Sequence, residues 1–166
     1  MKIYDQPIEI DQLNRINEYG PDDLFICCAG FEDRCIQAVS KMGVGFRTRF
    51  SIIFAVEDPF YKQHVETNLF KLQAELGKRT SEGVFVVRCQ RDGPTEAINQ
   101  LRSVWNRCKP KDPDEPCITI DISSFTKIYL LELLHFLVAE QNMGIPRLLH
   151  TTQTYAPTRL TRGVEQ

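Results

Sequence analysis

The chain has 166 residues, of which 42% are hydrophobic and 25% are charged, and its formal net charge is −2. A chain of this length and composition can bury a core of its own, so we expect one folded domain and not a disordered protein. The near-neutral charge argues against a protein that mainly coats duplex nucleic acid, because that task needs a strongly basic surface.

Short β-rich runs alternate with segments of helical periodicity. The predicted strands cover residues 24–29, 50–56, 84–89, 117–122 and 147–152, and a helix follows each of the first four. A weaker helix is predicted over 8–19, and three prolines within 109–116 predict an exposed connector. Strands that alternate with helices indicate βαβ units. We therefore predict an α/β protein: a three-layer, Rossmann-like domain over 1–156, with helices on both faces of a mainly parallel sheet of about five strands, and a loose tail over 157–166.

Capping residues locate the ends of the predicted helices. Gly43, Gly77 and Gly144 are expected to end the first, second and fourth helices. Asp58 is expected as the N-cap of the second helix and Pro59 as its first residue.

The fourth predicted helix, 126–143, is apolar on nearly all sides. One side is expected to cover the sheet, and another a neighbouring helix or a second subunit. We therefore expect a homodimer, or a partner protein, at this helix. Sedimentation that showed only a monomer at micromolar concentration would exclude the dimer.

Metal and membrane signals are missing from the sequence. The six cysteines and three histidines have no metal-ligand spacing, so we expect reduced thiols, a cytoplasmic location, and neither a metal site nor a cofactor. The longest apolar stretch, 128–139, is interrupted by Glu132 and His135 and is too short to span a membrane. The N-terminus also lacks the apolar run of a signal peptide.

Two loops carry the candidate site. If the strand order is 3-2-1-4-5, the loops after the first and fourth strands, 30–34 and 121–127, face each other where α/β sheets bind ligands. Glycine allows close backbone approach, hydroxyls beside a helix N-terminus favour phosphate, and cationic side chains add charge. The ligand-binding candidates are Gly30, Phe31, Arg34, Ser123, Ser124, Thr126 and Lys127.

Structural roles are the competing interpretation of the same residues. Ser124 can be simply an N-cap, Asp121 can bind loop amides, and 32–34 can be an ordinary first helical turn.

Residues 121–127 (DISSFTK) resemble the signature D/N-x-T-G-G-T-K of the CRISPR-associated Rossmann-fold (CARF) sensor domains. Asp121, Thr126 and Lys127 match, Ser123 replaces the threonine, and Ser124-Phe125 replaces the two glycines. The resemblance implies a dimeric module that binds cyclic or linear oligoadenylates in prokaryotic antiviral defence, sometimes with ring cleavage. It also implies that Ser123, Thr126 and Lys127 contact the ligand.

Three functions follow as alternatives. The first is a sensor or regulatory module that binds a phosphate-bearing nucleotide or oligonucleotide. The second is a small enzyme that hydrolyses an N-glycosidic or phosphoester bond of a nucleotide, with Glu32, Asp33 and Asp121 as catalytic carboxylates. The third is a structural subunit of a larger complex.

Overall fold

The structure, a computed structural model, describes residues 20–43, 45–144 and 146–151. Within these ranges five strands form one parallel sheet in the order β3-β2-β1-β4-β5. The strands are β1 (Asp22–Ala29), β2 (Thr48–Glu57), β3 (Thr80–Gln90), β4 (Ile118–Asp121) and β5 (Arg147–Leu149). The predicted fold class is confirmed, and the observed strand order is the one that makes β1 and β4 neighbours.

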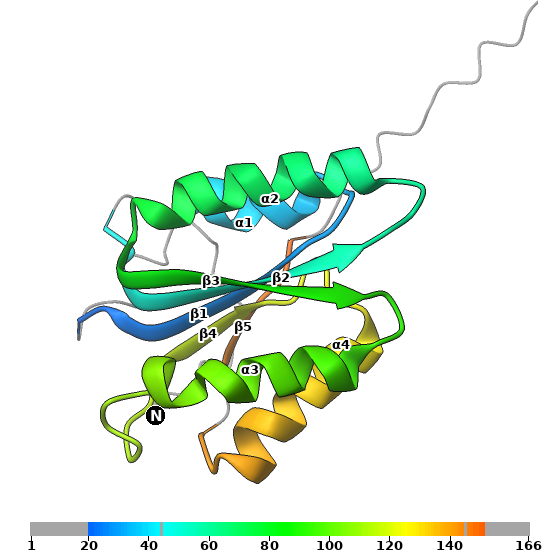
Figure 1. The fold of residues 1–166 in the computed structure, drawn as a ribbon. Coiled ribbons are helices and arrows are strands. Elements are labelled where there is room, and N and C mark those ends of the chain that lie inside the picture. Colours follow the sequence, from blue (N-terminus) through cyan, green and yellow to red (C-terminus); the bar gives the residue numbers. More distant parts are fainter. Residues whose placement is uncertain (1–19, 44, 145, 152–166) are drawn as a thin grey trace, which may run out of the picture.

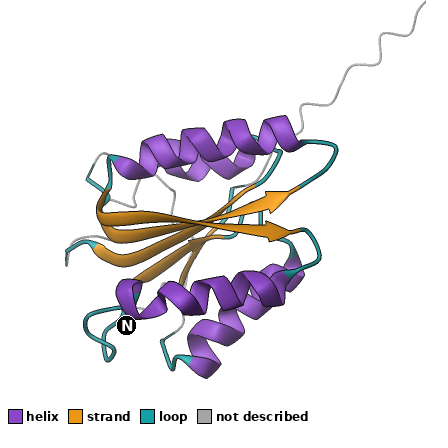
Figure 2. Ribbon diagram, viewed as in Figure 1, coloured by secondary structure: helices purple, strands orange, loops and turns teal. Residues whose placement is uncertain are grey.

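Helices cover both faces of this sheet (Figure 1). One face carries α1 (Arg34–Lys41) and α2 (Lys62–Gly77), and the other carries α3 (Pro94–Cys108) and α4 (Lys127–Leu134). A π-helical segment, η2 (His135–Glu140), continues α4. Figure 2 shows the resulting three layers. None of the described helices is long and apolar enough to cross a membrane.

The central strands are buried on both sides, which explains their continuous apolar runs. In β1, Leu24 and Ile26 belong to the core under α3 and α4, whereas Phe25 and Cys27 belong to the core under α1 and α2. All six cysteines are free thiols. Burial raises their pKa values, to about 11 for Cys35, so these thiols are unreactive packing groups.

The second helix begins later than predicted. The Asp58 carboxylate accepts hydrogen bonds from the amides of Phe60 (2.9 Å) and Tyr61 (3.2 Å), and α2 starts only at Lys62. Asp58 therefore closes a turn before the helix, and Pro59 is not the first helical residue. The prediction was wrong because aspartate stabilises such a turn with the same backbone hydrogen bonds that it uses as an N-cap.

Two elements near the end of the described chain are shorter than predicted. Regular α-helix stops at Leu134 instead of continuing to Met143, and the wider π turns follow, with the Gln141 amide donating to the Phe136 carbonyl. These turns leave Phe136 buried against α3, where its ring meets Trp105 edge-on. β5 ends at Leu149 and does not extend to 152. The predicted helix 8–19 and the tail, and so the limits of the predicted domain, lie outside the described residues.

Candidate functional site

The candidate loops leave two neighbouring strands at the carboxyl edge of the sheet. β1 leads into α1 on one face, and β4 leads into α4 on the other face. Adjacent parallel strands whose connections depart to opposite faces define the topological switch point, where open α/β sheets bind ligands. The fold therefore brings loops 30–33 and 122–126 together, as the predicted strand order requires.

At their closest point the two loops are separated by about the space that one methyl group would fill. A Cβ atom built on Gly30 would lie 3.6 Å from the Ser124 Cβ, which is ordinary van der Waals contact. Gly30 also lacks the positive φ that would demand glycine. The neighbouring Phe125 packs inward against Phe54, with ring centroids 5.5 Å apart. The Ser124 hydroxyl is buried in this contact and has no hydrogen-bond partner within the described part of the chain.

Asp121 and Ser123 form a buried polar link at the end of β4. The Asp121 Oδ1 accepts hydrogen bonds from the Ser123 amide (3.0 Å) and hydroxyl (2.5 Å), and the Ser123 Oγ accepts one from the Thr151 amide (2.8 Å). Their exposed fractions are 2% and 4%. Burial raises the pKa of Asp121, and the hydrogen bonds from Ser123 oppose that rise. This link ties β4 to the chain just beyond β5, so it has a structural role.

A side chain that the sequence reasoning missed holds the first loop. Asn68, buried on α2, donates through its amide to the carbonyls of Gly30 (3.0 Å) and Glu32 (3.4 Å). The signal was present in the sequence, since Asn68 is a polar residue on the buried face that also carries Val65, Leu69 and Leu72. A buried amide in that position needs a hydrogen-bond partner, and the loop carbonyls provide it.

Two of the charged residues at the first loop form an ion pair with each other. Arg34, half-buried at the start of α1, pairs with Glu32. Asp33 is exposed and precedes the helix. Among the described residues, no hydrogen bond joins any two of the three candidate carboxylates, Glu32, Asp33 and Asp121.

The head of α4 is open to solvent. Thr126 and Lys127 are both exposed, no side-chain hydrogen bond caps the helix, and Lys127 forms no ion pair with any residue that the structure describes. Thr126 and Ile128 line a shallow, open depression of about 470 Å³ between this helix and the loops after β2 and β3. The other lining residues are Glu57, Pro59, Gln90, Arg91 and Asp92. The hollow therefore lies beside the switch point and not between Gly30 and Lys127.

Exposed aromatic side chains lie in the β1–α1 and β2–α2 loops. Phe31 stacks on Tyr61 with ring centroids 4.5 Å apart and an interplanar angle of 18°, and Tyr61 also contacts His64 edge-on. Phe60 is 88% exposed. Of these, only Phe31 was a sequence candidate. Tyr61 was missed because its loop was interpreted as a helix cap and nothing more.

The outer face of α4 and η2 carries exposed apolar side chains. Ile128, Leu131 and Val138 are 52%, 67% and 40% exposed, whereas Tyr129 and Leu133 are buried against the sheet. The helix therefore carries apolar residues on both its buried and its exposed side, as the sequence indicated. Pairing through the exposed side with a second copy or a partner protein stays a prediction.

Comparison with known proteins gives no further assignment: no protein-family model, curated protein or solved structure matches the chain. Within the described residues no group of three histidine, cysteine, aspartate or glutamate side chains could hold a metal ion. The function must therefore be argued from the geometry of the carboxyl edge.

Proposed function

We propose that this protein is a sensor or regulatory module that binds a nucleotide or oligonucleotide at the carboxyl edge of its sheet. The observation that carries the proposal is the open depression beside the switch point, whose wall includes the exposed head of α4. Its position agrees with the general location of ligands in open α/β sheets.

The phosphate side of the ligand is assigned to Thr126 and Lys127. The first amides of a helix carry partial positive charge, and a lysine beside them adds a full charge. Lys127 has no competing carboxylate partner among the described residues, so an anion can approach it without breaking an ion pair.

Aromatic rings provide a second surface for a longer ligand. Phe31 and Tyr61 remain 42% and 45% exposed although they stack on each other, and an unpaired base can stack on exposed aromatic rings. A mononucleotide would occupy the depression alone, whereas an oligonucleotide could also place a base on these rings.

The resemblance to CARF domains implies three ligand contacts, and the exposure of two of these residues supports the proposal. Thr126 and Lys127 are exposed at the head of α4. The Ser123 hydroxyl already forms hydrogen bonds with Asp121 and Thr151. We therefore assign the ligand contacts to Thr126 and Lys127 alone. A role in prokaryotic antiviral defence is part of this proposal and rests on the resemblance.

The burial of one candidate carboxylate and the ion pair of another favour binding over hydrolysis. The Asp121 carboxylate is buried and hydrogen-bonded, and Glu32 pairs with Arg34. A general acid or base must reach the scissile bond within hydrogen-bond distance, and Asp121 lacks that access.

The test is a ligand panel with a matched pair of lysine variants. Mononucleotides, dinucleotides and oligonucleotides are added to the full chain, and thermal stabilisation and product release are both measured. We expect stabilisation without product, and we expect Lys127→Ala to weaken binding about tenfold because it removes a charge-assisted hydrogen bond. Lys109→Ala, which removes an exposed lysine after α3, should leave binding unchanged. Stabilisation by no member of the panel would contradict the proposal.

A further inference from the structure

The depression carries charges of both signs that do not pair with each other. Arg91 and Asp92 are exposed on the turn between β3 and α3, and Glu57 is exposed at the end of β2. Within the described residues, no ion pair joins Arg91 to either carboxylate. Elsewhere in the chain comparable groups do pair, such as Arg88 with Glu66 (2.7 Å) and Arg102 with Glu140 (2.6 Å). A ligand that presents acceptors and donors side by side would satisfy both charges at once.

The Glu57 carboxylate is held in place and still has free acceptor capacity. Its Oε2 accepts a hydrogen bond from the Gln90 side-chain amide at 2.8 Å. Each carboxylate oxygen can accept two hydrogen bonds, so both oxygens of Glu57 remain able to bind a ligand donor.

The walls of the depression suit a flat ring. Pro59 and Ile128 are apolar, both are exposed, and both line the hollow with the polar groups. Binding sites for small ligands combine apolar walls of this kind with a few polar groups that fix orientation.

We infer that the depression recognises guanine, so that the preferred ligand of the proposed nucleotide site is a guanine nucleotide. The ring N1–H and the exocyclic amino group of guanine donate to one carboxylate, Glu57, while its O6 and N7 accept from one guanidinium, Arg91. Adenine has an acceptor at N1 and an amino group in place of O6, so it offers Glu57 one donor instead of two and Arg91 one acceptor, N7, instead of two. This inference rests on the proposed function, because it specifies the base of the same ligand, and it departs from the adenine bases that the resemblance to CARF domains implies.

Binding of GMP, IMP and AMP to the full chain, measured by calorimetry, tests the inference. We expect GMP to bind at least tenfold more tightly than AMP. IMP keeps N1–H, O6 and N7 but lacks the exocyclic amino group, so its affinity should be intermediate.

Variants of exposed residues identify the groups responsible. Glu57→Gln should remove the preference of GMP over AMP, and Arg91→Lys should reduce it because lysine cannot form the paired hydrogen bonds. Glu115→Gln makes the same change in the exposed connector before β4, outside the depression, and is the matched control that should keep the preference; loss of preference in Glu115→Gln with retention in Glu57→Gln would overturn the assignment. Equal affinity for GMP and AMP in the unaltered protein would overturn guanine recognition while leaving the proposed function intact. Binding of neither would overturn both.

Discussion

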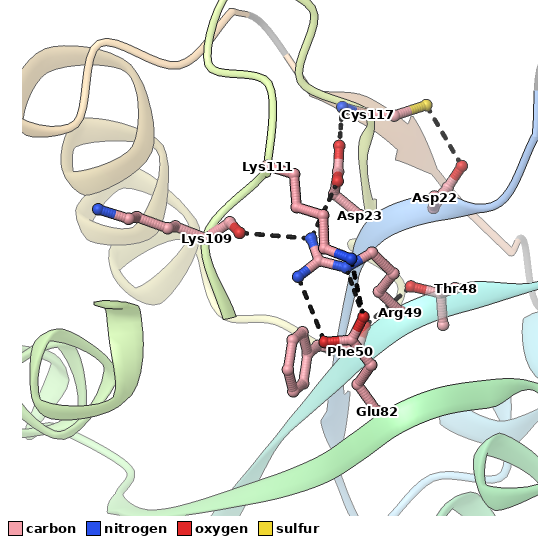
Figure 3. A network of polar contacts seen from close by, with 9 residues as sticks. All are labelled: Asp22, Asp23, Thr48, Arg49, Phe50, Glu82, Lys109, Lys111 and Cys117. Atoms are coloured by element: carbon pink, nitrogen blue, oxygen red, sulfur yellow. Dashed lines mark hydrogen bonds and ion pairs between the residues drawn. The ribbon is translucent and has the colours of Figure 1, made fainter. Parts of the chain in front are cut away.

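The amino edge of the sheet and the rim of the depression at its carboxyl edge use charge in opposite ways. At the amino edge, Arg49 pairs with Asp23 (3.1 Å) and Glu82 (2.9 Å), and Lys111 also reaches Glu82 (3.4 Å), as Figure 3 shows. At the carboxyl edge, Arg91 and Lys127 have no ion-pair partner among the described residues. The comparison separates charges that join strands from charges that remain available to a ligand.

Burial explains why the amino edge is structural. Asp22 is fully buried at the start of β1, where it accepts hydrogen bonds from the Thr119 hydroxyl (2.5 Å) and the Cys117 thiol (3.4 Å) and pairs with Arg147. These contacts join β1 to β4 and β5. A carboxylate without solvent is tolerated only when it is paired and hydrogen-bonded, and Asp22 meets both conditions.

The largest predicted effect tests the amino edge. Asp22→Asn removes the charge that Arg147 needs, and we expect the free energy of unfolding to fall by about 3 kcal/mol, because the half-buried Arg147 guanidinium is left without its counter-charge. Urea unfolding measures this change. Asp114→Asn, in the exposed connector, is the control and should stay within about 0.5 kcal/mol of the unaltered protein. A small effect at both positions would mean that the amino-edge network does not hold the strands.

A smaller effect is expected at the aromatic surface of the carboxyl edge. Phe31→Ala should weaken binding of a dinucleotide or oligonucleotide about tenfold, since stacking of one base contributes roughly 1–3 kcal/mol, and should leave mononucleotide affinity unchanged. Phe70→Ala removes another exposed ring, on α2, and serves as the control. Equal losses for short and long ligands would place Phe31 in the mononucleotide site instead.

The smallest predicted effect concerns Asp121, a buried carboxylate at the carboxyl edge. Because the folded-state pKa of Asp121 is raised, folding favours its protonated form. That stability is present below the unfolded pKa of about 4 and is lost as the pH rises through the folded-state pKa. Asp121→Asn cannot ionise, so its melting temperature relative to the unaltered protein should be higher at pH 7 than at pH 3.5. A difference that did not change with pH would show that the carboxylate is not destabilised by burial.

Much of the fold could be predicted because the strong signals are local. Apolar runs followed by helical periodicity located the strands and their helices, and the strand order assumed for the site is the observed one. The errors came where one residue type supports two local structures, as at Asp58, and where regular helix gives way to π turns after Leu134. Neither choice is visible in periodicity alone, because both depend on packing between elements.

The candidate site was predicted less completely than the fold. Loops 30–34 and 121–127 do meet, but the hollow is formed with residues of the β2–α2 and β3–α3 loops, such as Pro59 and Arg91. Their contribution depends on which loops lie next to the head of α4, and that follows from three-dimensional packing. Asn68 shows the same limit, because its partners are carbonyls 36 and 38 residues away in the chain.

The close approach of Gly30 and Ser124 has a consequence for kinetics. The space between these two loops is too narrow to enclose a nucleotide, and the open depression lies beside them on the rim of the sheet, where solvent reaches a bound ligand. Neither arrival nor departure then requires strands or helices to move apart, and we expect rapid exchange that follows the surrounding ligand concentration. The fraction of protein with bound ligand would then follow short-lived changes in ligand concentration, and the protein would not retain its ligand after the concentration falls.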